Sequence, residues 1–138
     1  MEKFKFVDLF AGLGGFHYAL KELGGECVFA SEIDPKLQEL YIRNHKLKKS
    51  LMYGDISKSV DQVPPHDVLV AGFPCQPFSK SGKQLGFEDT SRGNCIFYVI
   101  DILERLKPKY FIFENVSNFA KHNDCLLYTS PSPRDPWT

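Results

Sequence analysis

Short apolar segments alternate along the chain with stretches in which apolar residues recur at the helical spacing of i, i+3, i+4 and i+7. The apolar segments predict five strands, at residues 4–10, 27–31, 51–53, 68–71 and 110–113. The helical stretches predict three helices, which follow the glycine cluster at 12–15, begin at Pro35 and cover 96–106. Strands and helices that alternate in this way predict βαβ units and a parallel sheet.

The first two helices have predicted ends and predicted buried faces. The buried faces are expected to comprise Phe16, Ala19, Leu20 and Leu23 in the first helix, and Leu37, Leu40, Tyr41 and Asn44 in the second. Gly24 and Gly25 should end the first helix. Asp34 should cap the second helix, with Pro35 at its first position, because a carboxylate can accept from the unpaired N–H groups there.

The predicted fold class is α/β, with a Rossmann-like, doubly wound parallel sheet. The segment 68–71 is apolar on both faces, as buried parallel strands are. Ligands in such sheets bind at the carboxyl ends of the strands, near the point where the strand order reverses. The residues that directly follow each strand are therefore the candidates for a functional site.

Composition narrows the class of protein. A chain of 138 residues can form one domain, and its 43% apolar and 25% charged residues are ordinary for a globular protein. The 17 basic and 17 acidic residues cancel, which argues against a nucleic-acid binder that works alone. No stretch approaches the roughly 18 apolar residues of a membrane span, and no signal peptide is present, so a cytoplasmic protein is expected.

Four cysteines, at positions 27, 75, 95 and 125, form no CxxC pair. A zinc site is therefore not expected, and no other metal is predicted. Without a signal peptide a disulfide framework is not expected either. Most such thiols are buried as small apolar groups, but Cys75 has a different setting.

Three successive strand ends carry residues suited to a nucleoside cofactor. The glycines at 12–15 would let the backbone approach a ligand closely, although His17 stands where the pattern GxGxxG requires its last glycine. Glu32 ends the second strand, where a carboxylate can accept from both ribose hydroxyls. Asp55 follows the third strand and could accept from an adenine amine. Each residue alone has a plainer structural explanation, but together they predict either a nicotinamide dinucleotide or S-adenosylmethionine.

The loop after the fourth predicted strand reads GFPCQPFS and holds a candidate nucleophile. Pro74 and Pro77 restrict the backbone around Cys75, which would keep the thiol at the mouth of the sheet. Glu114 ends the neighbouring fifth strand, so the thiol and the carboxyl group should face one pocket. The four histidines fall in helices, turns or the C-terminal stretch, which argues against Cys–His hydrolase chemistry.

These segments together resemble the cytosine-C5 DNA methyltransferase family, as an N-terminal fragment, over residues 4–123. FVDLFAGLGGF at 6–16, SEID at 31–34 and GDI at 54–56 resemble its three cofactor motifs. GFPCQPFS at 72–79, the stretch 82–97 and ENV at 114–116 resemble its nucleophile loop, the segment after it and its ENV motif. Six motifs in the family's order make the resemblance highly specific.

The resemblance implies a cofactor, a substrate and a set of roles. S-adenosylmethionine would be the cofactor, and a cytosine flipped out of double-stranded DNA the substrate. Cys75 would add to C6 of the base, and Glu114 would donate a proton to N3. The implied cofactor-binding residues are Phe10, Gly12, Leu13, Gly14, Gly15, Glu32, Ile33, Asp55, Ile56 and Cys95. The implied substrate-binding residues are Pro74, Gln76, Ser79, Arg92 and Asn115.

Two of these residues depart from the family pattern, and the pattern itself ends early. Aromatic or leucine residues often occupy the positions of Ile33 and Cys95 in the family. Residues 1–124 are expected to form a partial cofactor-binding and catalytic domain, truncated after the fifth strand. Residues 125–138, with three prolines and no apolar period, are expected to be a disordered or artefactual tail outside the family, similar to translated adapter sequence. Residues 110–113 should then be an unprotected, aggregation-prone sheet edge.

The expected whole protein is a prokaryotic DNA cytosine-C5 methyltransferase of a restriction–modification system, monomeric when complete and acting at the nucleoid. Two alternatives remain open. One is a tRNA-methylating relative, which shares the nucleophile loop and the ENV motif. The other is a non-catalytic S-adenosylmethionine-binding module. The fragment alone is expected to be inactive, because the family's target-recognition region and closing helix are not in the sequence.

Overall fold

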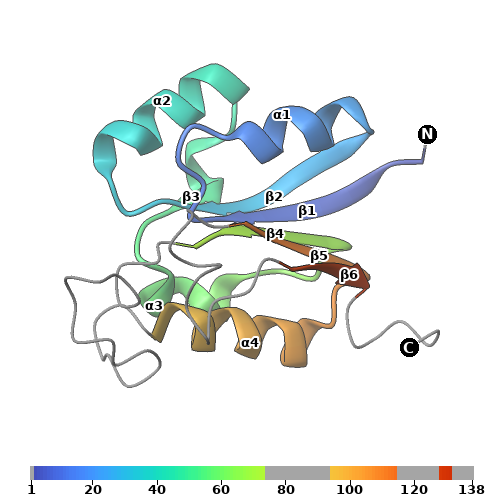
Figure 1. Ribbon diagram of the computed structural model, residues 1–138. Helices are drawn as coiled ribbons and strands as arrows, with labels where there is room; N and C mark the ends of the chain where they lie inside the picture. Colours follow the sequence, from blue (N-terminus) through green and yellow to red (C-terminus); the bar gives the residue numbers. More distant parts are fainter. Residues whose placement is uncertain (1, 74–93, 115–127, 132–138) are drawn as a thin grey trace.

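The computed structural model describes residues 2–73, 94–114 and 128–131 (Figure 1). Six of the predicted site residues lie outside these ranges: Pro74, Cys75, Gln76, Ser79, Arg92 and Asn115. Within the described residues, no helix is long and apolar enough to cross a membrane. The same residues contain no group of three or more His, Cys, Asp or Glu side chains that could hold a metal ion.

The helices and strands follow the predicted alternation. The strands are β1 (Phe4–Leu9), β2 (Gly25–Ser31), β3 (Met52–Tyr53), β4 (Val68–Gly72), β5 (Tyr110–Glu114) and β6 (Tyr128–Pro131). The helices are α1 (Gly15–Glu22), α2 (Pro35–His45), α3 (Ile56–Ser59) and α4 (Asn94–Leu106), with the 3-10 turns η1 (Lys49–Leu51) and η2 (Val60–Gln62). All five predicted strands and all three predicted helices are present. The sequence pattern did not predict α3, the 3-10 turns or β6.

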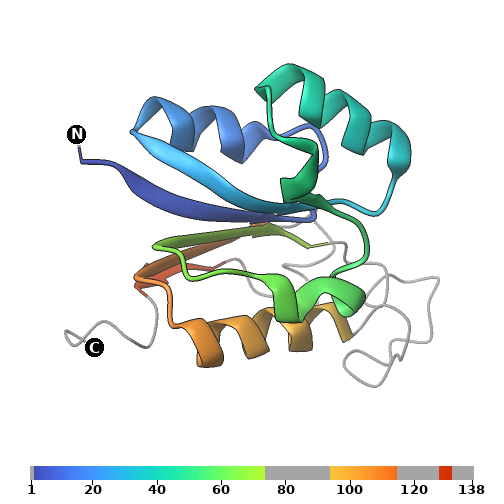
Figure 2. The same ribbon diagram turned by 180° about the vertical axis from the view of Figure 1, so that it is seen from behind.

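The strands form one sheet in the order β3-β2-β1-β4-β5-β6, and the first five of these are parallel. The helices α1 and α2 cover one face, and α3 and α4 cover the other (Figures 1 and 2). The chain passes from β3 at one edge to β4 on the far side of β1, so β1 and β4 flank the point where the strand order reverses. The predicted α/β, doubly wound sheet is therefore confirmed.

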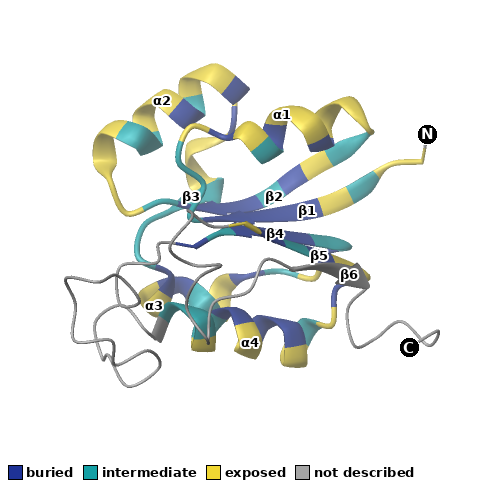
Figure 3. Ribbon diagram, in the orientation of Figure 1, coloured by how far each residue is buried: buried dark blue, intermediate teal, exposed yellow. Residues whose placement is uncertain are grey.

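Two apolar clusters, one on each face of the sheet, form the core. Figure 3 marks the buried residues of the strands and helices in dark blue. Successive side chains of β1 point to opposite faces. Val7 and Leu9 belong to the cluster beneath α3 and α4, whereas Phe6 belongs to the cluster beneath α1 and α2. All three are fully buried, and burial of side chains of this size stabilises the fold by about 1.5–3 kcal/mol each.

The predicted buried faces of α1 and α2 are partly wrong. The buried residues are His17 and Leu20 in α1, and Tyr41 and His45 in α2. Four residues predicted to be buried are exposed: Ala19, Leu23, Leu40 and Asn44. The buried histidine and tyrosine side chains form hydrogen bonds and ring contacts with one another, so polar groups take inward positions that apolar periodicity could not reveal. The predicted cap of α2 is confirmed, because the Asp34 side chain accepts from the backbone N–H of Lys36 at 2.9 Å.

The expected free edge on the fifth strand is also wrong. β6 pairs with β5 in an antiparallel register that runs from Tyr110 opposite Pro131 to Phe113 opposite Tyr128. Proline lacks an N–H group, which suggested that this part of the chain could not extend the sheet. In the structure Pro131 is the last residue of β6, where a missing donor weakens the ladder least.

Candidate active site

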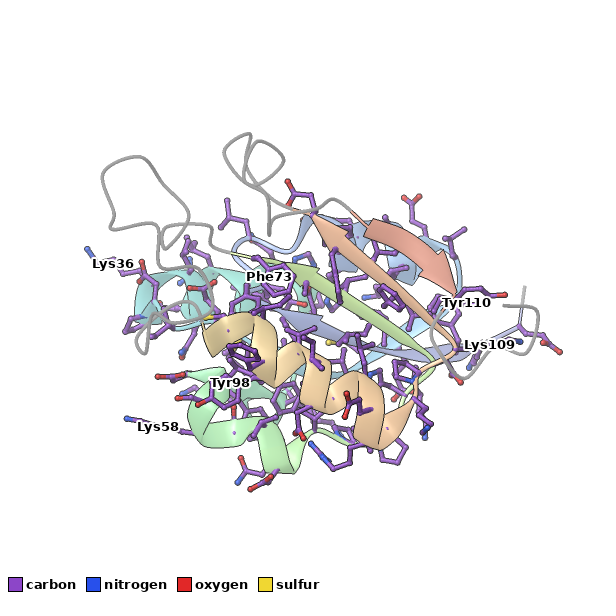
Figure 4. All side chains as sticks on the ribbon, turned by 60° about the horizontal axis from the view of Figure 1, so that its bottom comes forward. Lys36, Lys58, Phe73, Tyr98, Lys109 and Tyr110 are labelled. Atoms are coloured by element: carbon purple, nitrogen blue, oxygen red, sulfur yellow. The ribbon has the colours of Figure 1, made fainter. Side chains whose placement is uncertain are left out.

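The carboxyl ends of the parallel strands bring the described candidate residues to one edge of the sheet. β1 leads into the glycine loop (residues 11–14), and Glu32 follows β2. β4 leads directly to Phe73, and β5 ends with Glu114. Figure 4 shows Phe73 at this edge, whereas Tyr110, the first residue of β5, lies at the opposite end of the sheet. The predicted placement of candidate residues at strand ends is confirmed, while their roles remain predictions.

The glycine loop has the left-handed backbone that its sequence requires. Gly12 has φ +55° and Gly14 has φ +86°, values that favour glycine because it has no Cβ. The loop is closed by a hydrogen bond from the N–H of Gly14 to the carbonyl of Ala11 at 2.9 Å. The N–H of Ala11 donates to the carbonyl of Ser31 at 2.8 Å, which ties the loop to the end of β2. Loop and strand end therefore form one unit.

The Glu32 carboxylate completes this unit. Its Oε1 accepts from the N–H of Gly12 at 2.9 Å, and its Oε2 accepts from the N–H of Asp34 at 2.9 Å. A carboxylate has about four acceptor positions, so each oxygen can still accept from a ligand hydroxyl. The two backbone bonds hold both oxygens in place.

Asp55 has a structural function that competes with its predicted one. Its Oδ1 accepts from the backbone N–H of Ser57 at 2.9 Å and from the Ser57 hydroxyl at 2.7 Å, so the residue caps α3. No hydrogen bond to Oδ2 occurs among the described residues, which leaves that oxygen for a ligand amine. Ile56 is 4% exposed and packs in the core, so a ligand could reach only its backbone.

Four further candidates from the sequence, Phe10, Leu13, Ile33 and Cys95, differ in how far they are exposed. Ile33 is 70% exposed and Leu13 is 55% exposed, which is unusual for side chains of this type and leaves apolar surface for a ligand. Phe10 is partly buried against Phe73, with ring centroids 5.6 Å apart. Cys95 is half-buried in the first turn of α4. The structure thus places Leu13 and Ile33 at an open surface, and Phe10 and Cys95 partly inside the fold.

Glu114 lies at the junction of β4 and β5. The N–H of Phe73 donates to its backbone carbonyl at 3.0 Å. A Cβ added to Gly72 would lie 3.4 Å from Oε1 of Glu114, which is ordinary contact distance and places this carboxyl group beside the end of β4. Glu114 is exposed and can meet a ligand from solvent. The predicted neighbourhood of the fourth and fifth strands is confirmed.

A buried polar network beneath the glycine loop escaped the sequence analysis. Asp8 of β1 is 1% exposed and accepts from the hydroxyl of Tyr41 at 2.9 Å. The same hydroxyl lies 2.7 Å from Nδ1 of His17. The ring of His17 stacks on that of His45, with centroids 4.2 Å apart. The sequence did contain one signal for this network, because Asp8 stands in the middle of the apolar segment FVDLF. A carboxyl group buried in a strand requires a hydrogen-bond partner.

Burial moves the proton equilibria of this network toward neutral forms. Desolvation raises the pKa of Asp8 from 3.8 to about 7, with a smaller contribution from the negative charge of Glu32. Desolvation lowers the pKa of His17 from 6.5 to about 4, and His45 adds to this effect. Burial also raises the pKa of Tyr41, which therefore remains a hydrogen-bond donor. Below neutral pH a protonated Asp8 can donate to Tyr41, and Tyr41 to the neutral ring of His17.

The Cys27 thiol, by contrast, is chemically inert. It is buried beside Tyr41, and desolvation raises its pKa to about 12. Because the thiolate is the reactive form, Cys27 cannot act as a nucleophile near neutral pH. Its predicted place inside an apolar strand is confirmed.

The two shifted groups should give opposite pH dependences of stability. Asp8 contributes fully to the free energy of unfolding below pH 3.8, and this contribution is lost as the pH rises through about 7. His17 contributes fully above pH 6.5, and its contribution is lost as the pH falls through about 4. Between pH 4 and 6.5 the two slopes oppose each other. Asp8→Asn should therefore stabilise the chain progressively between about pH 4 and 7, by up to roughly 4 kcal/mol, because an amide carries no charge. Urea unfolding of the 138-residue chain at several pH values measures this.

The same change at Asp61 is the matched control, because this carboxyl group is exposed, and it should change stability by less than about 0.5 kcal/mol. A pH-independent effect of Asp8→Asn would show that the buried carboxyl group does not titrate as its burial requires.

Three alanine substitutions should separate backbone strain from steric overlap in the glycine loop. A methyl group at Gly14 would overlap the imidazole of His45 and lie 2.8 Å from Cε2 of Tyr41. Gly14→Ala should cost about 3 kcal/mol or more, and Gly12→Ala, with a positive φ but open space, about 1–2 kcal/mol. Gly15→Ala, with neither problem, should change stability by less than about 0.5 kcal/mol. Urea unfolding gives the order, and equal effects at positions 14 and 12 would contradict the overlap.

Comparison with known proteins gives a consistent result. The family model described as C-5 cytosine-specific DNA methylase matches residues 4–129. The chain is 50% identical over 121 residues to Type II methyltransferase M.HhaI of Haemophilus parahaemolyticus, covering 87% of this chain and 36% of the relative. It is 48% identical over 125 residues to Type II methyltransferase M.HpaII of Haemophilus parainfluenzae, covering 88% of this chain and 34% of the relative. The chain thus spans about a third of the length of these curated relatives.

A solved structure shares the fold. The crystal structure of Dnmt2 methyltransferase from S. pombe superposes with a TM-score of 0.67 and 27% sequence identity, over 88% of this chain and 39% of that one. The fold of this chain is therefore one that a known methyltransferase also has.

Proposed function

Because this chain belongs to the C-5 cytosine-specific DNA methylase family, we propose that it forms the cofactor-binding and catalytic part of a DNA cytosine-C5 methyltransferase. Residues 1–124 would constitute that part. The named relatives are Type II methyltransferases, and we extend this class, with its role in restriction–modification, to the complete enzyme. The matched part is 36% of the first of these relatives, so we propose that the complete enzyme has further chain. That further chain would contain the region that recognises the target sequence.

One observation carries the proposal beyond the family match. Glu114 lies over Gly72, at the point where β4 ends and Phe73 begins the loop toward Cys75. Cys75 lies outside the described residues but follows Phe73 by only two positions in the sequence, and we propose that its thiol serves the same pocket as this carboxyl group. A thiol and an exposed carboxyl group would thus reach the same base from neighbouring strands.

This pair matches the chemical difficulty of the reaction. C5 of cytosine is a poor nucleophile, and addition of the Cys75 thiolate to C6 makes it nucleophilic by forming an S–C6 bond and moving the ring electrons toward C5 and N3. Glu114 would donate a proton to N3 and so neutralise the charge that develops there. After C5 is methylated, loss of its proton to a base restores the double bond and expels the Cys75 thiolate. The other predicted contacts to the flipped nucleotide come from Pro74, Gln76, Ser79, Arg92 and Asn115.

The described residues fit S-adenosylmethionine. Nothing lies within 4 Å of an added Cβ at Gly12 or Gly15, so open space adjoins this backbone. The Glu32 carboxylate can accept from ribose hydroxyls, and the exposed side chain of Ile33 offers an apolar surface for adenine. Oδ2 of Asp55 can accept from the adenine amine. When bound, this cofactor supplies an electrophilic methyl group.

Trapping of the covalent intermediate tests the proposal. The complete enzyme, a longer chain that includes these residues, is incubated with S-adenosylmethionine and a mixed-sequence DNA duplex in which 5-fluorocytosine replaces cytosine. Fluorine cannot leave C5 as a proton does, so the enzyme should remain attached to the DNA through Cys75. Peptide mapping of the denatured adduct identifies the attached residue.

Two matched substrates accompany this experiment. A duplex with ordinary cytosine should give methylation without a stable adduct, and a fluorinated RNA of the same sequence should give neither. Attachment through Cys95 or Cys27 would remove Cys75 from its proposed role. Adduct formation with RNA alone would replace DNA by RNA as the substrate.

A further inference from the structure

We propose that His45 is a positioning residue, which holds the glycine loop (residues 11–14) in the shape that cofactor binding requires. His45 is the last residue of α2 and has no part in the proposed methyl transfer. The inference rests on the proposed function for the identity of the cofactor. It adds a residue that is distant from the loop in sequence but contacts it in space.

The first contact is a hydrogen bond to the loop backbone. Nε2 of His45 lies 2.9 Å from the carbonyl oxygen of Leu13. A carbonyl oxygen only accepts, so Nε2 must carry the proton, and this bond selects one tautomer of the neutral ring. The imidazole thereby supplies a donor to a loop carbonyl that accepts no backbone hydrogen bond from the residues that the structure describes.

The second contact is steric. The imidazole lies against Cα of Gly14, because a Cβ built there would be 2.8 Å from Cδ2 of the ring and closer still to Nε2. Gly14 has φ +86°, and its N–H closes the loop by donating to Ala11. The imidazole of His45 therefore fills the space beside Gly14. Both the hydrogen bond to Leu13 and the contact with Gly14 depend on this conformation of the loop.

The ring itself is held firmly. His45 is 5% exposed and stacks on His17 with an interplanar angle of 20°. Tyr18 and Tyr41 contact its ring at centroid distances of 4.5 and 4.6 Å. Tyr41 is anchored in turn to Asp8 of β1. Ring contacts from α1 and α2 thus restrain the imidazole, and the hydrogen bond to β1 restrains Tyr41.

The loop transmits this restraint to the proposed cofactor contacts. Gly12 donates to Oε1 of Glu32, so the position of that oxygen depends on the loop that His45 holds. Loss of the donor should weaken cofactor binding without changing the chemistry at Cys75. The expected signature is a rise in the KM for cofactor at nearly constant kcat.

Two substitutions test the role. In the complete enzyme His45→Phe keeps a ring but removes the donor, and should raise the KM for S-adenosylmethionine about three- to tenfold with kcat within about twofold. His45→Gln places an amide N–H near the position of Nε2 and should restore the KM to within about twofold. His66→Phe makes the same change at a buried histidine at the opposite edge of the sheet, beside Lys3 and Asp67, and should leave the KM unchanged.

A second readout is independent of methyl transfer. In the 138-residue chain without cofactor, His45→Phe should speed amide exchange at Gly14 at least about threefold, while the amide of Val70 in β4 exchanges as before. Unchanged exchange at Gly14 overturns the inference whether or not the enzyme methylates DNA. Faster exchange in an enzyme that never methylates DNA would leave the positioning role in place and refute the proposed function. A lower melting temperature in both His45 variants with no change in KM or exchange would reduce His45 to a packing residue.

Discussion

Cys75→Ser should lower methyl transfer by the complete enzyme by on the order of 10³-fold or more, while its affinity for S-adenosylmethionine stays within about twofold. A serine hydroxyl is far less ionised than a thiol at neutral pH and is a poorer nucleophile toward C6. Cofactor affinity should be preserved because the glycine loop and Glu32 follow β1 and β2, whereas Cys75 follows β4. Single-turnover transfer of labelled methyl and calorimetric titration of the cofactor measure the two quantities.

Cys27→Ser is the matched control. The Cys27 thiol is buried with a pKa raised to about 12, and its replacement should leave methyl transfer within a few-fold of the original rate. Loss of activity in both variants would point to a shared effect on folding. A Cys75→Ser enzyme that still methylates cytosine would eliminate the covalent mechanism.

Glu114→Gln should slow methyl transfer by on the order of 10²-fold or more. The amide has nearly the same shape and can still hydrogen-bond to the base, but it cannot supply an acidic proton to N3. The space beside Gly72 accommodates either side chain, so folding should be unaffected. Single-turnover kinetics at saturating cofactor and DNA isolate the chemical step.

Glu104→Gln makes the same change at an exposed position on α4 and should leave the rate unchanged. If Glu114→Gln slowed transfer no more than Glu104→Gln did, proton donation to N3 would have to come from another group.

The arrangement of strands and helices was accessible from the sequence because the parallel strands are buried on both faces. Such strands are mostly apolar, as the segment 68–71 is, and their number, order along the chain and approximate ends could be predicted. The same reasoning located Glu32 and Glu114, since ligands of doubly wound sheets meet the carboxyl ends of strands.

The buried polar network of Asp8, His17, Tyr41 and His45 could not be predicted from the sequence in this way. His17 and His45 lie outside the apolar stripes of their helices, and their burial depends on contacts between residues far apart in the chain. Asp8 needed Tyr41 as a partner, 33 positions away. The pairing of β6 with β5 was also missed. Whether a segment joins a sheet depends on whether an edge strand is free to pair with it, and not only on the segment's own pattern of apolar residues.

The contact between His45 and Gly14 constrains how this part of the chain can evolve. A side chain at position 14 becomes possible only after position 45 has changed to something smaller, and even then the ring of Tyr41 would have to shift and φ +86° disfavours most residues. A reversal at position 45 would be blocked once position 14 had acquired a side chain. The two positions therefore form an epistatic pair across 31 positions of sequence, and the order in which they mutate determines which sequences are reachable.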